Sequence, residues 1–507
     1  MDPSGRETWL LSRRLFVAGV ALVYALAFAQ LGVQVQGLFG SRGIAPLAEQ
    51  LDRLAAAVDG WQRLAWPSLL WLDASDAMLS GICVAGTLSA VLVLFGVLPR
   101  LLLLLCWLLY LSLVRVGEPF LEFQWDTLLL ETGLLAALFA PGGLRPFGRG
   151  ERAPSPVLRW LIYWLLCRLL LLSGLLKLAS GDPSWRDGTA LDFHYWTQPL
   201  PHVLSHYVHW LPAWSHVLSL WLMFAIELGT PLLLLVPFAR RRCRQIAAAA
   251  VVLLMLAIAA TGNYGFFNLL AAVPCVLLLD DRAWRALLRR PAPAAPPAVR
   301  PTPKWRRITV ALFAVLTLLV TADRGCEAFD WDLDPPWPVD WLHRIAEPLD
   351  QVAAPFESFN NYGLFRVMTR ERPELLVEGS ADGVDWRPWG FRYKPLDLER
   401  APVFAGLYMP RLDWQLWFAA LDHRLVRDSA WTLGLLRRLL EGSPPVLGLL
   451  GDNPFPERPP RYARIRISQY EFSTPDERVT GRWWQRSEPK DYSGAWTLEN
   501  GELRRAR

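Results

Sequence analysis

Long apolar segments separated by short polar loops recur through the first two thirds of the chain. Their lengths approach the roughly 20 residues that an α-helix needs to cross a bilayer. The seventh and eighth segments are short, but joined as one helix they would be about 51 Å long, too long for one crossing, so we expect a hairpin. The pattern predicts nine membrane-spanning helices, at residues 15–35, 78–97, 101–117, 124–140, 157–178, 213–236, 246–260, 266–279 and 306–322.

A different pattern begins after residue 322, where short runs alternate between apolar and polar positions. Residues 375–377 lead into the hairpin signal Asp382-Gly383, and residues 462–467 alternate strictly. Between them, residues 410–421 and 431–440 have the apolar spacing of amphipathic helices. We therefore predict a polytopic α-helical membrane domain at residues 1–322, with exported loops at 36–77 and 179–212, followed by an exported β-sandwich-like domain with inserted helices at 323–507.

The distribution of charge supports this division of the 507 residues. Residues 1–322 contain 27 Lys/Arg and 18 Asp/Glu, whereas residues 323–507 contain 25 and 29. Apolar segments of this length exclude an ordinary soluble enzyme and a disordered chain. The basic residues cluster in loops beside apolar segments, for example Arg240-Arg241-Arg242 and Arg289-Arg290. Such clusters mark the cytoplasmic side of a membrane protein, so they indicate a lipid bilayer as the partner rather than nucleic acid. The positive-inside rule places the N-terminus in the cytoplasm and the C-terminal domain on the opposite face.

The N-terminus leaves one alternative open. Arg13-Arg14, an apolar run and Ala27-Phe28-Ala29 together resemble a signal peptide with a cleavage site. Apolar character continues beyond that site, through Val33 and Val35, which favours an uncleaved membrane span. The segment from Arg289 to Pro303 is rich in Pro and Ala and predicts an extended cytoplasmic linker.

Charged side chains inside the predicted spans are candidate functional residues, because an unpaired charge there is costly. Arg168 and Glu131 lie near the middle of adjacent spans, so we predict an ion pair, with Glu227 of the sixth span as the competing partner. Lys177 ends the fifth span at the exported interface. Snorkelling of its amine to the interface is one explanation, and a partly desolvated amine that serves as a base is the other.

Polar and aromatic residues converge on the exported side of the membrane, in the loop 181–201 and in the hairpin 261–270. The hypothesis from this convergence is a functional pocket, with eight candidate residues: Asp182, Trp185, His194, Tyr195, Gln198, Asn263, Tyr264 and Asn268. Five of the seven histidines fall within one stretch of 23 residues, 194–216. His202, His206 and His209 have the spacing of one helix face, but no carboxylate accompanies them, so we predict an interfacial belt rather than a metal site.

The exported domain carries no GxSxG, HExxH, P-loop or GxGxxG motif, which predicts a binding module that uses no cofactor. Its aromatic richness suggests that exposed side chains hold a client protein. The candidate client-binding residues are Trp386, Trp389, Trp414, Trp417, Trp483 and Trp484. Cys326 is the only cysteine assigned to this domain, which rules out an internal disulfide.

Several motifs together resemble the lipase maturation factor family, in both halves and in order. They are the loop 181–201, TGNYGFFNLL (261–270), NNYGLFRVMT (360–369), EGSADGVDW (378–386), PRLDWQLWFAAL (410–421), NPFP (453–456) and the Trp483-Trp484 pair. The run from Ser173 to Lys177, followed by Trp185, is more loosely similar to the membrane domain of vitamin K-dependent carboxylases, in which a lysine is the catalytic base.

The first resemblance implies a membrane-embedded maturation factor for secreted clients, lipases among them. The second implies an alternative, an intramembrane enzyme that modifies exported proteins or lipids with Lys177 as its base. The family also implies the endoplasmic reticulum membrane with a lumenal C-terminal domain. The scarcity of cysteine and the Ala/Leu/Arg/Pro-rich composition suggest a bacterial source, for which the inner membrane and the periplasm are expected.

Overall fold

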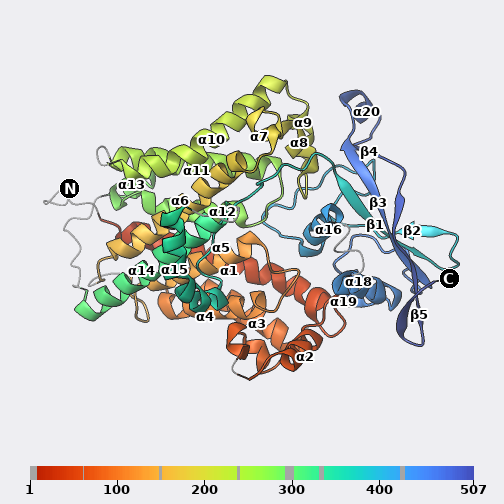
Figure 1. The fold of residues 1–507 in the computed structure, drawn as a ribbon, viewed down its shortest axis with the longest axis horizontal. Coiled ribbons are helices and arrows are strands. Elements are labelled where there is room, and N and C mark those ends of the chain that lie inside the picture. Colours follow the sequence, from red (N-terminus) through yellow and green to blue (C-terminus); the bar gives the residue numbers. More distant parts are fainter. Residues whose placement is uncertain are drawn as a thin grey trace.

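A computed structural model describes residues 8–60, 62–147, 151–236, 240–291, 302–329, 336–422 and 429–506. Helices from the first half of the chain form an elongated bundle, and the strands of the second half form a twisted sheet beyond one end of it (Figure 1). Most of the predicted linker at 289–303 lies outside the described residues.

Six helices of the bundle are long and apolar enough to cross a membrane. They are α1 (Leu10–Phe39), α3 (Asp76–Leu94), α6 (Pro156–Ala179), α10 (Ala213–Leu235), α11 (Arg240–Thr261) and α14 (Lys304–Glu327). The other three predicted segments coincide with shorter helices, α4 (Pro99–Val114), α5 (Gln124–Phe139) and α12 (Phe267–Ala272) with its continuation η3 (Val273–Leu278). The helical character of the membrane part is confirmed, whereas the count of nine crossings stays a prediction.

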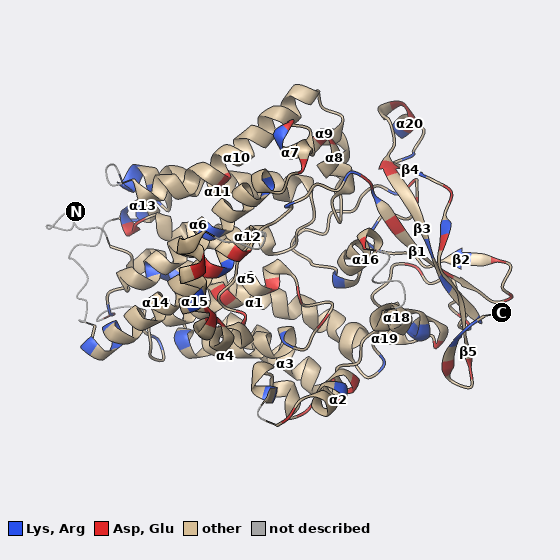
Figure 2. Cartoon of the chain, viewed as in Figure 1, with Lys and Arg blue, Asp and Glu red and all other residues tan. Residues whose placement is uncertain are grey.

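Basic residues gather at the end of the bundle that is farthest from the sheet, where α11 and α14 begin (Figure 2). The short helix α13 (Asp281–Leu287) lies at this end too, and Asp281 accepts hydrogen bonds from the backbone of Leu10, Leu11 and Ser12 at the start of α1. From there α1 continues unbroken through residues 27–29 to Phe39.

The predicted exported loops fold into short helices at the end of the bundle that faces the sheet (Figure 1). The first loop contains α2 (Leu47–Ala57), η1 (Gln62–Ala65) and η2 (Leu69–Trp71). The second contains α7 (Pro183–Arg186), α8 (Ala190–Thr197) and α9 (Val203–His209).

The second half contains one antiparallel sheet of six strands in the order β2-β1-β3-β5-β6, with β4 paired to β3. The strands are β1 (Pro373–Ser380), β2 (Trp386–Pro388), β3 (Tyr462–Phe472), β4 (Trp484–Arg486), β5 (Lys490–Glu499) and β6 (Glu502–Arg505). Among the described residues this is a single sheet, so the predicted sandwich of two sheets is not confirmed. The hairpin expected at Asp382-Gly383 does join β1 to β2, with Gly383 at a positive φ of 82°.

Helices cover the sheet on the side of the bundle. They are α16 (Arg411–Leu421), α18 (Ala430–Leu440) and α19 (Pro444–Leu447), while α20 (Pro475–Val479) lies between β3 and β4. Every residue of β1 is buried. One continuous hydrophobic core includes Phe28 of α1, Leu128 of α5, Leu375 of β1 and Trp414 of α16. The core therefore crosses the boundary that the composition suggested between the two halves.

One amphipathic helix was not predicted from the sequence. It is α15 (Trp337–Ala353), which is followed by η4 (Ala354–Phe356) and packs along α14. Ala353 joins a small core with Val320 and Phe359, whereas Trp341 on the other face is 60% exposed. Prolines at both ends and at Pro348 obscured its helical pattern.

Candidate functional site

A segment of the second half inserts among the helices of the bundle and meets the charges predicted to pair there. Arg168 of α6 forms an ion pair with Glu131 of α5, and their side chains are 3% and 1% exposed. The other carboxylate oxygen of Glu131 accepts hydrogen bonds from the backbone N–H of Asn360 (3.1 Å) and the hydroxyl of Tyr362 (2.7 Å). Arg168 donates to the carbonyl of Asn360. We call these four residues the Glu131 cluster; it ties residues 360–362 to two helices.

The chain approaches α6 closely just beyond this cluster. A Cβ atom on Gly363 would lie 2.5 Å from Cδ1 of Leu176, closer than two carbon atoms can pack without movement. The motif NNYGLF therefore contains a glycine because its backbone passes directly over α6.

Lys177 and Glu227 form a second buried ion pair, between α6 and α10. Nζ of Lys177 lies 2.7 and 3.0 Å from the two carboxylate oxygens of Glu227, and both side chains are buried. Lys177 thus does not snorkel to an interface, and Glu227 does not compete for Arg168. The ring of Trp185 lies 5.5 Å from Nζ, so the amine has the surroundings of a structural ion pair.

A third buried pair fixes α16 to the bundle, and we call it the Arg411 cluster. Arg411 donates two parallel hydrogen bonds to Asp126 of α5, at 2.7 and 2.9 Å, and the hydroxyl of Tyr110 donates to the same carboxylate at 2.5 Å. Gln34 of α1 accepts from the backbone N–H of Arg411 and donates to the carbonyl of Met409. Bidentate pairing of this kind is both strong and directional.

The predicted pocket residues come together, but they bind each other and the second half directly. The hydroxyl of Tyr264 donates to Oε1 of Gln198 at 3.0 Å and lies 3.4 Å from Nε2 of His194. Asn263 donates to the carbonyl of Val403 at 2.8 Å and accepts from the N–H of Ala405 at 2.7 Å. These residues form a packed contact between the helix ends and the loop 401–409.

Two more pocket candidates, Asp182 and Trp185, contact the segment 366–370. Asp182 accepts from the N–H of Met368 (2.7 Å) and from Arg370 (3.1 Å). Burial opposes ionisation of Asp182, but hydrogen bonds from Met368, Ser184 and Arg370 keep its pKa below the ordinary value. Trp185 donates to the carbonyl of Arg366.

The last two candidates, Tyr195 of the loop 181–201 and Asn268 of the hairpin 261–270, are both buried. Tyr195 packs against His216, whose Nδ1 lies 2.7 Å from Asp192. Asn268 is buried, and its side-chain oxygen has no hydrogen-bond partner among the described residues.

The three histidines considered for a metal play separate roles. His202 accepts from the N–H of Leu204 and so caps α9, while Nε2 of His206 lies 3.1 Å from the carbonyl oxygen of Ser473. His209 packs beside Trp210 and Phe472. His206 and His209 belong to an aromatic contact between α9 and Phe472 of the sheet, whereas His202 packs on Phe404.

The pKa values of two histidines in this region predict how the stability of the folded chain depends on pH. Burial lowers the pKa of both His194 and His209 to about 4, and the charge of Lys177 adds to the effect on His194. His194 keeps some accessible surface, but the protein surrounding its ring penalises the charged form. The unfolded chain, with an ordinary histidine pKa of about 6.5, binds more protons between these values, so stability is complete above about pH 6.5 and falls as the pH drops towards 4.

This pH dependence is measured by thermal unfolding of the purified full chain in detergent between pH 7.5 and 4.5. The double variant His194→Gln/His209→Gln should lose less stability over that range than the parent. An equal loss in both proteins would contradict the assignment to these rings.

Most of the predicted client-binding tryptophans are in the interior, which corrects the sequence-based hypothesis. Five are at most 7% exposed, namely Trp389, Trp414, Trp417, Trp483 and Trp484; only Trp386 is partly exposed. Trp414 packs on Trp125 of α5, and Trp417 donates to the carbonyl of Thr197. Trp414 and Trp417 join α16 to the first half of the chain, and none of the five buried tryptophans is available as a surface anchor.

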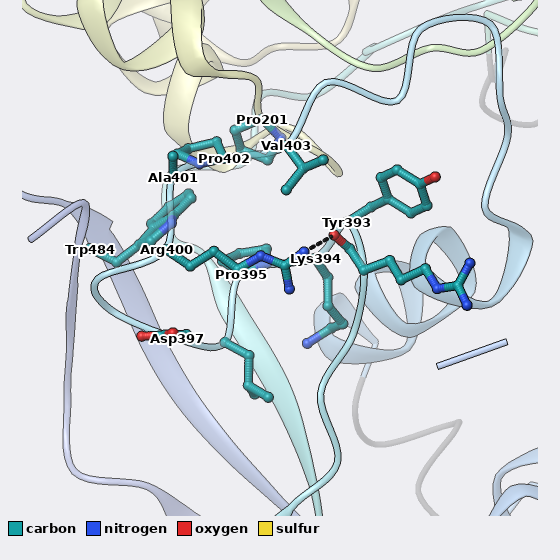
Figure 3. A pocket seen from close by; sticks show the side chains of 12 residues that line it. Pro201, Tyr393, Lys394, Pro395, Asp397, Arg400, Ala401, Pro402, Val403 and Trp484 are labelled. Carbon is teal, nitrogen blue, oxygen red and sulfur yellow. Dashed lines mark hydrogen bonds between the residues drawn. The ribbon is translucent and has the colours of Figure 1, made fainter. Parts of the chain in front are cut away.

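Surface depressions border the second half, among them a small one and a larger cleft. The smaller one is lined by Lys394, Asp397 and Arg400 of the loop 392–403 and by Trp484 of β4 (Figure 3). The amine of Lys394 lies 2.6 Å from a carboxylate oxygen of Glu374. The larger is a cleft of about 670 Å³ between α2, the loop 118–122, α18 and the strands β5 and β6. Its charged and aromatic lining comprises Glu49, Arg53, Glu118, Glu122, Trp431, Arg437, Arg438 and Trp496.

Comparison with known proteins assigns the family. The family model described as "Lipase maturation factor transmembrane domain" matches residues 11–286, and "Lipase maturation factor C-terminal domain" matches residues 358–494. The chain belongs to the lipase maturation factor family. No solved structure matches it.

Individual relatives cover nearly all of the chain. Lipase maturation factor 2 from Homo sapiens is 34% identical, over 97% of this chain and 84% of its own length. Lipase maturation factor 1 from Bos taurus is 32% identical, over 94% of this chain and 88% of its own length. The resemblance seen in the motifs is thereby confirmed, and several of those motifs prove to be the junction between the bundle and the sheet.

Proposed function

We propose that this chain is a membrane-embedded maturation factor that helps secreted lipases to reach their active form. The observation that carries the proposal is the match of both halves, in order, to relatives that are named for lipase maturation. In this proposal the N-terminus is cytoplasmic and the sheet lies on the exported side, in the lumen of the endoplasmic reticulum or in the periplasm, according to the source. The basic end of the bundle supports that orientation.

The alternative of an enzyme with Lys177 as its base has no support from the relatives named above. The surroundings of the amine also speak against it, since Glu227 occupies two of its hydrogen-bond directions and Trp185 covers it. We therefore propose a role in folding and assembly rather than in covalent chemistry.

The cleft is the proposed surface for the client. It joins surfaces of both halves and, in the orientation proposed above, faces the exported side. Glu118 and Glu122 are exposed on its rim, and burial together with the charge of Glu118 raises the pKa of Glu122. Arg437 and Arg438 on α18 face the same cleft. A surface with both charge signs beside Trp431 and Trp496 suits a folded protein partner.

The test measures active secreted lipase in cells that depend on this chain for maturation. Reversal of both rim charges, in Glu118→Arg/Glu122→Arg, should lower lipase activity at least tenfold while the amount of the factor stays constant. The matched control is Glu457→Arg/Glu488→Arg, the same change of charge at exposed positions outside the cleft. Equal activity in the cleft variant and the parent would overturn the assignment of the cleft, and full lipase activity without the factor would overturn the function.

A further inference from the structure

Three potential metal ligands meet where the last long helix ends. Asp323 and Glu327 lie one turn apart at the end of α14, and His343 lies on α15, which packs against it. Among the described residues, these three form the group of His, Cys, Asp and Glu side chains whose ligand atoms all lie within 4.8 Å of one another. Neither family resemblance nor sequence spacing singled them out.

The distances within this group suit a small cation. Nδ1 of His343 lies 3.2 Å from Oδ2 of Asp323 and 3.5 Å from Oε1 of Glu327. Two ligands held about 2.0–2.1 Å from a tetrahedral zinc ion are about 3.3–3.4 Å apart. The atoms therefore need little movement to share one ion.

A second observation points to a missing partner. The side chain of Asp323 is only 3% exposed, and its Oδ1 has no hydrogen-bond partner among the described residues. Oδ1 is bonded to the same carbon as Oδ2, which contacts His343, so this unpartnered oxygen lies close to the group. A buried carboxylate oxygen without a partner is unfavourable, and a cation bound at this point would satisfy it.

We propose that Asp323, Glu327 and His343 bind a divalent transition-metal ion, with Zn²⁺ as the best fit. One imidazole nitrogen and two carboxylates favour zinc over calcium or magnesium, which prefer oxygen ligands alone. The two carboxylates balance the charge of the ion. His343 and Glu327 are partly or largely exposed, so an ion can enter from solvent and keep water in its fourth position.

A metal at this position would clamp α15 to the end of α14. Arg324, next to Asp323, already pairs with Asp350 of α15 at 2.6 Å and donates to the carbonyl of Phe359 at 2.8 Å. Phe359 precedes the segment that enters the Glu131 cluster. The ion would therefore stabilise the joint through which the chain passes from the last span into the second half.

The test is a zinc titration of the purified full chain in detergent after removal of metal with a chelator. We expect about one Zn²⁺ per chain by competition with a chromophoric chelator, and no competition by Ca²⁺. Asp323→Asn, Glu327→Gln and His343→Asn should each weaken zinc binding by at least about tenfold. The control is Asp192→Asn, which changes another aspartate–histidine pair without a third ligand and should leave zinc binding unchanged.

Size-exclusion chromatography and circular dichroism show whether each variant is folded, and the titration of the parent does not depend on them. X-ray absorption of the parent with zinc should show only nitrogen and oxygen ligands. Failure of the parent to bind zinc, unchanged binding in all three ligand variants, or sulfur coordination would each overturn the proposal.

Discussion

Arg411→Met is expected to lower the free energy of unfolding by about 3–5 kcal/mol, because it leaves the carboxylate of Asp126 buried without its partner. Both side chains are at most 2% exposed, and two direct hydrogen bonds join them. The measurement is denaturation of the purified full chain in detergent, in which the midpoint should fall well below that of the parent.

Two further variants show that the loss comes from the unpaired charge. Asp126→Asn combined with Arg411→Met should recover part of the stability, since no buried charge then remains. Arg437→Met removes a guanidinium from an exposed pair with Glu441 and should cost at most about 1 kcal/mol. If Arg411→Met is as stable as Arg437→Met, the Arg411 cluster does not hold α16 on the bundle.

Glu131→Gln is expected to cost a similar amount, about 3–5 kcal/mol, and to loosen one particular segment. Gln would keep the size of the side chain but leave Arg168 without a counter-charge, and it would weaken the acceptor for Asn360 and Tyr362. Hydrogen exchange of the peptide that covers residues 358–366 should become faster.

The matched control is Glu227→Gln, the same chemical change in the buried pair that joins α10 to Lys177 of α6. It should destabilise the bundle and leave exchange of that peptide close to the parent. Tyr362→Phe removes a single hydrogen bond to a carboxylate and should cost about 1.5–3 kcal/mol. Equal exchange of the peptide in Glu131→Gln and Glu227→Gln would show that the Glu131 cluster does not tether the segment.

Periodicity along the chain predicted the secondary structure well where one local pattern decides it. The helix expected at 410–421 is α16, the helix expected at 431–440 is α18, and the strand expected from residue 462 is β3. The hairpin signal at Asp382-Gly383 did not predict how short the second strand is, because β2 ends at Pro388. Trp389 packs on Phe455 in the core instead of continuing a strand.

Pairing across long sequence separations was harder to predict. Glu131 and Arg168 are 37 residues apart on adjacent helices, so their depth in the bilayer suggested the contact. Asp126 and Arg411 are separated by 285 positions, and each resembles an ordinary polar residue near a helix end. Large aromatic residues in a polar region suggested a surface for clients, but such side chains also dominate protein interiors, and Trp414 and Trp417 here fill the contact between the two halves.

The insertion of residues 360–362 and Arg411 among the helices makes the two halves one unit for protein engineering. A fragment that starts after the last span would leave Asp126, Glu131 and Gln34 behind, and it would expose the apolar surface that α16 covers. A chimera that takes its second half from a relative would fold only if the contacting residues of α1 and α5 were taken from the same relative. The change in amino-acid composition at residue 322 is therefore a poor boundary at which to truncate the chain or to join it to another protein.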